Sequence, residues 1–377
     1  MTESIEIKNV GPIRHIRIDL VKPMTVLIGE SGSGKSVLMK TIMLMRYVFK
    51  LINIHSALKN SGISSPLNLS LEELLHDDMV NYFKPLKDAV AEVTYTVNNK
   101  YTIRIHNGQL VTDDFFDVKS EDLVFLKESW VTDMRSAIPM WINKRVGMPD
   151  TGFYFKETTE DFHKASAAVD DLPLNFLDMR MEIKTDDQKR KIFLAPNNGT
   201  YAPVELQQTS SGMQSSAPLL LLADYFARKF SFKDAIQRSI VSYLYQQDNL
   251  KNFRPDLEFS EMPKIVHMHI EEPELSLYPS AQCKLIEQLT HIMSTAADDR
   301  KMELMIATHS PYIINYLNVI IRKGETITGN NLGVYRIYNG ELQNLMMKTE
   351  AGKWIVNTRD LTEPMTNILQ EYRQLNK

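Results

Sequence analysis

Residues 24–36 read Met-Thr-Val-Leu-Ile-Gly-Glu-Ser-Gly-Ser-Gly-Lys-Ser, and this stretch decides the fold. Its first five residues form a short, mostly apolar run that predicts a buried strand. Residues 29–36 match the pattern G-x-x-x-x-G-K-[ST], and the segment from Ser36 to about Leu51, which lacks Pro and Gly, predicts a helix. A strand, a glycine-rich loop and a helix in this order predict a phosphate-binding loop. The alternative is a glycine-rich turn without a ligand.

The residue types of this loop explain the predicted chemistry. Glycines let successive backbone N–H groups point into one concavity that binds phosphate oxygens, and the helix N-terminus favours the same anion. Lys35 is expected to reach the β- and γ-phosphates, and the Ser36 hydroxyl is expected to ligate Mg²⁺. We therefore expect ATP and Mg²⁺ as ligands. The predicted nucleotide-binding residues are Gly29, Glu30, Ser31, Gly32, Ser33, Gly34, Lys35 and Ser36.

Two carboxylates follow a second apolar segment. Residues 265–270 predict a strand, which runs into Glu271, Glu272, Pro273 and Glu274. We expect this strand to lie beside the phosphate-loop strand, so that Glu271 joins Ser36 at the Mg²⁺. Glu272 is then the expected catalytic base, which polarises the attacking water. An acidic turn on a surface edge is the alternative, and Glu274 could be structural.

A histidine ends the next apolar segment. Residues 304–307 predict a strand, Thr308 and His309 follow it, and a helix is expected from Pro311. If this strand neighbours residues 265–270, His309 emerges at the same edge and can contact the γ-phosphate or orient the water. The predicted catalytic residues are therefore Glu272, His309 and Lys35. His267 and His269 share one face of their strand, and we expect them to pack or to form hydrogen bonds.

Composition excludes several classes of protein. The chain has 377 residues, of which 43% are hydrophobic and 24% charged, as in a folded globular protein. A single cysteine, Cys283, excludes a disulfide framework and a cysteine-based zinc site. No run approaches the roughly 18 apolar residues of a membrane span, and residues 1–10 lack the apolar core of a signal peptide. These features predict a cytoplasmic protein without a membrane partner.

The charge balance bears on nucleic-acid binding. The chain has 43 Lys and Arg against 47 Asp and Glu, for a net charge of −4, which argues against a constitutive polybasic surface. The most visible basic cluster is Lys184 to Lys191, and Asp186 and Asp187 interrupt it. A solvated charged face is the favoured interpretation, although a local DNA-binding patch stays open.

Strands that alternate with helices predict an α/β fold with a mixed or parallel sheet. The phosphate loop and the clear C-terminal pattern assign residues 1–55 and 205–345 to one head. Residues 56–204 are expected to form an inserted α+β lobe of unknown role, and residues 346–377 a helical tail. Helices are expected at 217–229 and at 232–247.

Taken together, the segments GESGSGKS (29–36), IEEPELSLYP (270–279) and ATHSPYII (307–314) resemble the ABC-type ATPase heads of the SMC and RecF kind. The nearest resemblance is to OLD-like, AAA-labelled bacterial ATPases, including those of anti-phage defence systems. Tyr278-Pro279 departs from the His-Pro that is usual there. Residues 209–214, Thr-Ser-Ser-Gly-Met-Gln, resemble the signature motif S-S-G-x-Q of that family, although a Ser-Gly cluster before a helix is more often a simple cap.

The resemblance implies a site shared by two copies of the chain. Ser211 and Gly212 of one copy would cap the γ-phosphate bound in trans by the other, so that ATP binding drives a head-to-tail dimer or a higher oligomer. Gln109 is a weak candidate for the family's glutamine loop. Transporter subunits are disfavoured, because the motif after the acidic pair differs and residues 56–204 are too long an insertion.

The resemblance also implies a partner. Only about 37 residues follow residue 340, too few for the TOPRIM nuclease domain of OLD proteins. We therefore expect a separate effector, most plausibly a nuclease, controlled in phage defence. The alternatives are a RecF-like ATPase of DNA repair or recombination, and a nucleotide switch that scarcely hydrolyses ATP.

Overall fold

The computed structural model describes residues 1–64, 66–75, 79–84, 89–112, 115–138, 153–186, 189–254, 262–361 and 363–375. Eleven strands form the central sheet, in the order β6-β5-β4-β1-β2-β15-β14-β3-β13-β12-β7. Their bounds are β1 Glu3–Val10, β2 Ile13–Ile18, β3 Met24–Ile28, β4 Glu92–Val97, β5 Tyr101–His106, β6 Gln109–Leu110, β7 Phe125–Val131, β12 Lys264–Glu271, β13 Lys301–Thr308, β14 Leu332–Tyr338 and β15 Glu341–Asn344.

One half of this sheet is parallel. Strands β14, β3, β13, β12 and β7 pair in parallel, so the carboxyl ends of all five lie at the same edge. The other half is an antiparallel meander through β1, β2, β4, β5 and β6. The predicted α/β fold with a mixed sheet is confirmed. Parallel strands need helical crossovers, which places helices on the faces of the parallel half.

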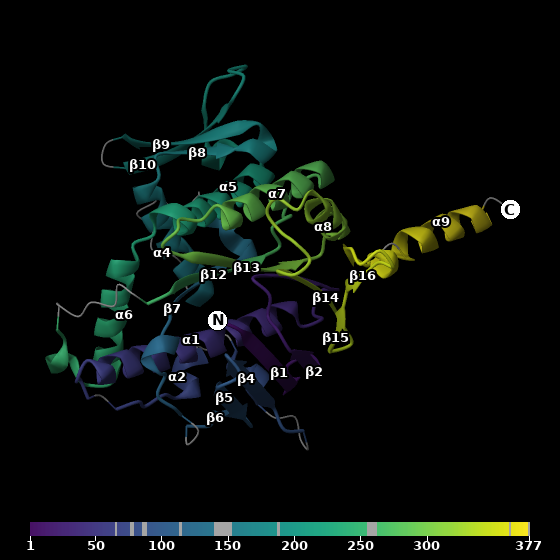
Figure 1. The fold of residues 1–377 in the computed structure, drawn as a ribbon. Helices are drawn as coiled ribbons and strands as arrows, with labels where there is room; N and C mark the ends of the chain where they lie inside the picture. Colours follow the sequence, from purple (N-terminus) through teal and green to yellow (C-terminus); the bar gives the residue numbers. More distant parts are fainter. Residues whose placement is uncertain are drawn as a thin grey trace.

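Helices cover both faces of the parallel half (Figure 1). Helix α1 lies on one face, and α5, α7 and α8 lie on the other. The helix bounds are α1 Lys35–Asn60, α2 Leu71–Leu75, α4 Phe153–Ala168, α5 Ser211–Asp224, α6 Phe232–Gln246, α7 Pro279–Ser294, α8 Pro311–Lys323 and α9 Glu363–Leu375. Two apolar clusters, one on each side, are therefore excluded from water.

Two helices differ in length from expectation. Helix α1 runs on from Leu51 to Asn60, because no Pro or Gly interrupts the sequence before Gly62. Helix α5 begins at Ser211 and gives way at Tyr225 to a π-helical turn that reaches Lys229. Helix α6 lies where a helix was predicted. Among the described residues, no helix has the length and apolar character to cross a bilayer.

The expected inserted lobe is only partly separate. Strands β4 to β7 come from within residues 56–204 but belong to the central sheet. A smaller antiparallel sheet, in the order β11-β10-β9-β8, stands apart near α5 (Figure 1). Its strands are β8 Asp171–Leu174, β9 Met179–Asp186, β10 Lys189–Pro196 and β11 Val204–Glu205. The boundaries at 56 and 204 stay a prediction, although the sheet shows that the head also draws on residues 92–131.

The expected tail contains a small hairpin and a helix. Strands β16 (Met346–Lys348) and β17 (Trp354–Val356) pair with each other, and α9 projects away from the rest of the molecule (Figure 1). The start of the tail at residue 346 stays a prediction.

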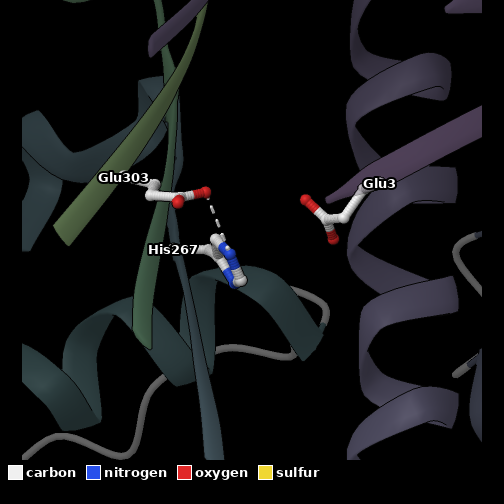
Figure 2. A group of neighbouring side chains, drawn as sticks. All are labelled: Glu3, His267 and Glu303. Atoms are coloured by element: carbon white, nitrogen blue, oxygen red, sulfur yellow. Dashed lines mark ion pairs between the residues drawn. The ribbon is translucent and has the colours of Figure 1, made fainter. Parts of the chain in front are cut away.

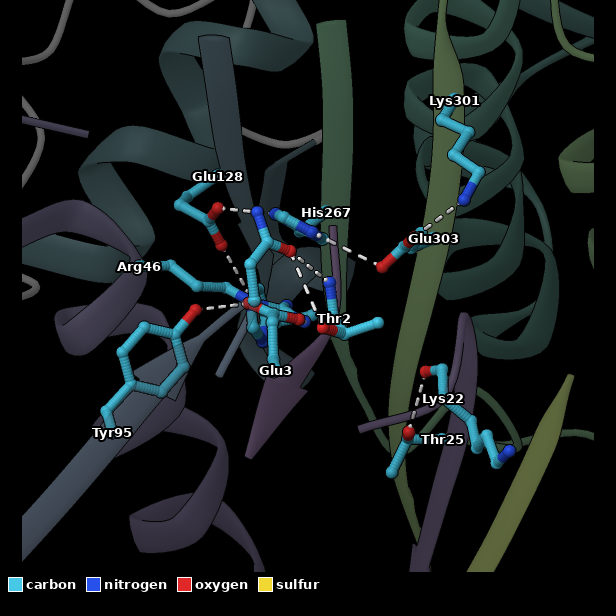
Figure 3. A network of polar contacts seen from close by, with 12 residues as sticks. Thr2, Glu3, Lys22, Thr25, Arg46, Tyr95, Glu128, His267, Lys301 and Glu303 are labelled. Carbon is cyan, nitrogen blue, oxygen red and sulfur yellow. Dashed lines mark hydrogen bonds and ion pairs between the residues drawn. The ribbon is translucent and has the colours of Figure 1, made fainter. Parts of the chain in front are cut away.

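A buried polar network crosses the core between α1 and the sheet (Figure 3). Arg46 of α1 donates to both carboxylate oxygens of Glu3, at 2.9 and 2.6 Å, and the Tyr95 hydroxyl donates to the same carboxylate. His267 and His269 both contact the Glu128 carboxylate, at 2.7 and 2.8 Å. The prediction that these two histidines form hydrogen bonds is confirmed.

Candidate active site at the carboxyl edge of the parallel strands

The glycine-rich loop joins β3 to α1 in a conformation that requires glycine. Gly34 has φ 109°, a left-handed value that side chains disfavour. A Cβ on Gly29 would lie 2.5 Å from the Ile337 carbonyl oxygen, so the loop packs too closely on β14 for a side chain. The backbone of the loop therefore curls around a concavity at the start of α1, which is the conformation expected of a phosphate loop.

Two groups in the loop fit an anionic ligand. The Lys35 ammonium donates to the carbonyl oxygens of Gly29 and Glu30, at 2.8 and 2.9 Å, and burial lowers its pKa. The Ser33 hydroxyl is buried and makes no hydrogen bond within the described part of the chain. A buried cation and an unsatisfied hydroxyl on a helix N-terminus fit phosphate oxygens.

Glu271 lies at the carboxyl end of β12 and faces the loop. The Ser36 side chain lies close enough to lower the pKa of Glu271, and both residues line the same cavity. Burial raises the pKa of Glu271, and the nearby Asp133 carboxylate raises it further, whereas Ser36 and Lys40 lower it. A hydroxyl and carboxylates that crowd together are the hard oxygen ligands that Mg²⁺ prefers. Ser36 and Glu271 therefore fit the predicted metal site.

Glu272 and His309 form a pair on neighbouring strand ends. Glu272 has φ 43°, which is strained for a residue with a side chain, and its N–H donates to the Ala307 carbonyl at 2.8 Å. The turn brings its Oε1 to 3.4 Å from Nε2 of His309. Both side chains are about one-third exposed, so water reaches them. Glu274 has the structural role left open by the sequence, because its Oε1 accepts from the His309 N–H at 2.6 Å.

One cavity of about 520 Å³ brings these groups together. It contains the phosphate loop, both acidic residues of the strand end, and the histidine. Tyr82 and Pro12, which the sequence did not single out, also line it. The lining residues are Pro12, Ser31, Gly32, Gly34, Lys35, Ser36, Val37, Tyr82, Asp133, Glu271, Glu272, Ala307 and His309.

Arg135 holds the acidic turn in place through hydrogen bonds to its backbone. Its buried guanidinium donates to the carbonyl oxygens of Glu271 and Glu272, at 2.7 and 2.6 Å. It also donates to the carbonyl of Ser215 on α5 at 3.0 Å. Burial lowers the pKa of Arg135 to about 10, although Glu274 and Asp133 oppose this shift. One side chain thus ties the strained Glu272 backbone to helix α5.

The expected signature segment starts α5. Ser210 caps the helix by accepting from the N–H of Met213, and Ser211 is exposed. Gly212 is buried, because a Cβ there would lie 2.6 Å from the Ser276 carbonyl oxygen. Neither Ser211 nor Gly212 lines the cavity of this chain. Their predicted contact with a γ-phosphate in trans stays a prediction.

Two expectations from the sequence are wrong. Strand β12 does not lie beside β3, because β13 lies between them and pairs with both. The acidic residues therefore reach the loop across one intervening strand. Gln109 lies on β6, at the far end of the sheet from β7, and does not line the cavity. Sequence spacing alone does not reveal the order of parallel strands.

Sequence reasoning missed the strand that borders β12. Trp130, Asp133 and Arg135 come from β7 and from the 3₁₀ turn Asp133–Ala137 that follows it. The signal was the run Phe-Leu-Lys-Glu-Ser-Trp-Val with Thr-Asp after it, which repeats the pattern of an apolar segment with polar residues at its end. Lys127 and Glu128 interrupt the apolar run, so the segment does not have the continuous apolar pattern of a buried strand.

The basic cluster Lys184 to Lys191 forms the ends of β9 and β10. Residues 187–188 lie outside the described residues, and so do the side chains at 185, 186 and 189. Lys184 pairs with Glu182 at 2.7 Å, which fits a solvated charged face.

Comparison with protein families gives two matches. A family described as AAA ATPase domain matches residues 148–314, and a family described as AAA domain matches residues 4–138. The first match contains the acidic and histidine segments, and the second contains the phosphate loop. The chain is thus similar to AAA-type ATPase domains over both parts of the site. No curated protein sequence matches the chain.

Several solved structures align with most of the chain at low similarity. One is an SMC head bound to the C-terminal winged-helix domain of ScpA, with 10% identity, a TM-score of 0.37, and coverage of 93% of this chain and 99% of that chain. The SMC head domain from Thermotoga maritima has 12% identity and a TM-score of 0.35, with coverage of 92% of this chain and 99% of that chain. A structure of the recombination mediator protein RecF has 10% identity and a TM-score of 0.35, with coverage of 92% of this chain and 98% of that chain.

Proposed function

We propose that this protein hydrolyses ATP at the carboxyl edge of β3, β13 and β12. The carrying observation is that one cavity holds the phosphate loop, the side chains of Ser36 and Glu271, and the Glu272–His309 pair. A phosphate site, a metal site and a solvent-accessible base within one cavity are the parts that phosphoryl transfer to water requires. The similarity to AAA-type ATPase domains over both segments supports the same proposal.

Each residue of the site has a role in this proposal. Lys35 and the loop N–H groups bind the phosphates, and Ser36 and Glu271 hold Mg²⁺, which when bound neutralises phosphate charge. Glu272 accepts a proton from the attacking water while the water oxygen bonds to the γ-phosphorus. The bond between the γ-phosphorus and the bridging oxygen of ADP breaks, and its electron pair stays on ADP. His309 lies 3.4 Å from Glu272 and orients that water. Arg135 holds the backbone of both glutamates in place.

Tyr82 is proposed to contact the base of the nucleotide. Tyr82 is 41% exposed and lines the cavity together with Pro12 and the phosphate loop. An exposed aromatic ring at the wall of a nucleotide cavity offers a stacking face to a planar base. Gly11 permits this placement, because a Cβ there would lie 2.5 Å from the Tyr82 ring.

A composite site between two copies is the second part of the proposal. Ser211 is exposed at the N-terminus of α5, and neither Ser211 nor Gly212 lines the chain's own cavity. In a head-to-tail dimer, Ser211 and Gly212 of one copy would meet the γ-phosphate held by the other. Since Gly212 is buried here, Ser211 is the residue that makes the first contact.

Control of a separate effector, a nuclease in phage defence, completes the proposal. Its support is the resemblance of the acidic motif to OLD-like ATPases and the ATP-dependent closure that a composite site implies. A RecF-like role in DNA repair is the alternative. The two separate in a DNA-binding assay with a salt series, because contacts to DNA phosphates weaken steeply as salt rises.

The first experiment measures ATP binding and turnover of wild type, Lys35→Ala and Lys59→Ala. We expect Lys35→Ala to abolish both, because the phosphates lose their cation. Lys59 is exposed on the same helix and pairs with Asp117, so Lys59→Ala is the matched control and should behave as wild type. Equal ATP binding by Lys35→Ala and wild type would contradict the proposed site.

A second experiment measures mass in solution with and without ATP and Mg²⁺. Wild type is expected to gain an ATP-dependent larger species, and Ser211→Arg to lose it by blocking the approach of the second copy. An ATP-dependent species that Ser211→Arg leaves unchanged would contradict the composite site but not ATP binding.

A further inference from the structure

Three charged side chains form a row across the parallel strands, away from the active-site edge. His267 of β12 pairs in register with Glu128 of β7 on one side and with Glu303 of β13 on the other. Side chains at paired positions of parallel strands project from the same face of the sheet. The His267 side chain is 1% exposed, Glu128 4% and Glu303 11%. The row is therefore part of the buried interior.

Glu128 fixes the orientation of the His267 ring. Its Oε1 accepts from Nδ1 of His267 at 2.7 Å. This contact leaves Nε2 on the far side of the ring, directed toward Glu303, as Figure 2 shows. Within the described part of the chain, Nε2 is buried and makes no hydrogen bond. A carboxylate that holds one ring nitrogen while the other stays available is the usual arrangement around a metal-binding histidine.

The spacing of the free atoms fits a metal ion. Nε2 of His267 lies 3.4 Å from Oε2 of Glu303, which is long for a hydrogen bond. Two ligand atoms that are each about 2.0–2.1 Å from a tetrahedral Zn²⁺ lie roughly 3.3–3.5 Å apart. The Glu3 carboxylate faces the same space, and one ligand atom from each of the three residues lies within 4.8 Å of the others.

The charges around this space call for a cation. Three buried carboxylates, those of Glu3, Glu128 and Glu303, meet one buried guanidinium, that of Arg46. Arg46 donates to both oxygens of Glu3, but Oε2 accepts only one of these bonds and keeps a free lone pair. Lys301 is 3.9 Å from Glu303 and mostly exposed, so it offsets little of the buried charge. Metal binding requires the neutral form of His267, so the ion would replace its proton. Three carboxylates and one guanidinium then leave two negative charges, which match one divalent ion.

We propose that His267, Glu303 and Glu3 bind a divalent transition-metal ion, with Zn²⁺ the best fit, while Glu128 holds the histidine in place. This site is separate from the Mg²⁺ site, and a nitrogen ligand favours zinc over magnesium. The ion would join β1 to the β12–β13 pair beneath α1, in the network that Figure 3 shows. The alternative occupant of the same space is a proton on Nε2 that His267 shares with Glu303.

The test uses the full chain without a histidine tag, stripped with a chelator and reloaded with Zn²⁺ under excess Mg²⁺. Bound zinc after gel filtration is measured by mass spectrometry of the metal, and Co²⁺ loading is followed by visible absorption. We expect one Zn²⁺ per chain, the absorption of tetrahedral Co²⁺, and a higher melting temperature with Zn²⁺ than without. Less than a tenth of an equivalent of bound zinc in wild type overturns the proposal and assigns the space to a proton.

Variants then locate the ion. His267→Gln and Glu303→Gln are expected to weaken Zn²⁺ binding at least tenfold. His269→Gln is the matched control, because His269 is buried on the same strand and contacts the same Glu128, at 2.8 Å, without facing Glu3 or Glu303. It should bind Zn²⁺ as wild type does. If His267→Gln fails to fold, the less buried Glu303→Gln decides, and unchanged zinc binding in a folded Glu303→Gln overturns the proposal.

Discussion

The strands β7, β12 and β13 carry two polar regions of opposite character. At their carboxyl ends, Glu271, Glu272 and His309 line a cavity that is open to water. Nearer the amino ends, Glu128, His267 and Glu303 are enclosed between the sheet and α1. The same residue types thus serve a solvent-accessible site in one region and an interior network in the other, a few residues along the same strands.

The two regions differ more in the surroundings of their side chains than in the types of residue that they contain. Burial raises the pKa of Glu271, because few positive groups compensate the loss of water. Burial alone would also raise the pKa of Glu303, but His267 lowers it to about 2. Burial would lower the pKa of His267, and Glu128 and Glu303 instead raise it to about 9. Buried charges persist only where partners are in place.

The largest expected effect is in the buried region. Arg46→Met removes the guanidinium that pairs with Glu3 and leaves this buried carboxylate without that partner. We expect the free energy of unfolding to fall by about 3–5 kcal/mol. Chemical denaturation measures it, with Arg17→Met as control, because Arg17 is 63% exposed and pairs with the exposed Asp19. A loss below about 1 kcal/mol would show that the network does not stabilise the fold.

The next largest effect is expected at Arg135, which connects α5 to the acidic turn of the open region. Arg135→Lys keeps the charge but loses the fork of donors that holds the carbonyls of Glu271 and Glu272. We expect kcat for ATP to fall by roughly 10²-fold, because small displacements of catalytic groups have effects of this size. ATP affinity should stay within a few-fold of wild type.

Arg14→Lys, at an exposed position, is the matched control for this measurement. An Arg135→Lys variant that loses affinity and keeps kcat would show that Arg135 supports the nucleotide rather than the base.

A smaller effect concerns the fit of α5 on the acidic turn. Gly212→Ala places a Cβ 2.6 Å from the Ser276 carbonyl oxygen, and this backbone cannot yield without moving the turn. We expect the free energy of unfolding to fall by about 1–3 kcal/mol. Ser211→Ala, at the exposed neighbour, should change it by less than about 0.5 kcal/mol. Equal stability of the two variants would mean that α5 does not pack as described.

The smallest effect is a pH dependence of stability at Lys50 of α1, which lies beside the start of β7. The Lys50 ammonium lies 4.9 Å from the Phe125 ring centre, and burial and the nearby Lys127 lower its pKa to about 8. Between pH 8 and about 10.4 the unfolded chain binds more protons at Lys50 than the folded chain, so this residue destabilises the fold below pH 8 and less as pH rises. Lys50→Met should therefore stabilise the protein at pH 7 by about 1–2 kcal/mol more than at pH 10.

Thermal melts of both proteins at the two pH values check this difference, and Lys59→Met is the exposed control. A difference of the opposite sign would mean that Lys50 is stabilised by its surroundings.

The sequence predicts the open region better than the buried one. The phosphate loop, the residues after β12 and His309 each occupy one contiguous motif at a strand end, so local patterns locate them. The row of Glu128, His267 and Glu303 depends on the register of three strands from distant parts of the chain, which no local pattern contains. Arg135 was missed for the same reason, because its carbonyl partners become neighbours only after folding.

We propose above all that the strand ends form a hydrolytic site with Glu272 as its base. The most direct test is ATP turnover and ATP binding of Glu272→Gln, beside Glu341→Gln as an exposed control. We expect turnover to fall by about 10²–10⁴-fold with ATP binding intact, because only the proton acceptor is removed. Turnover equal to wild type in Glu272→Gln would contradict the account and leave a nucleotide-binding loop without an assigned base.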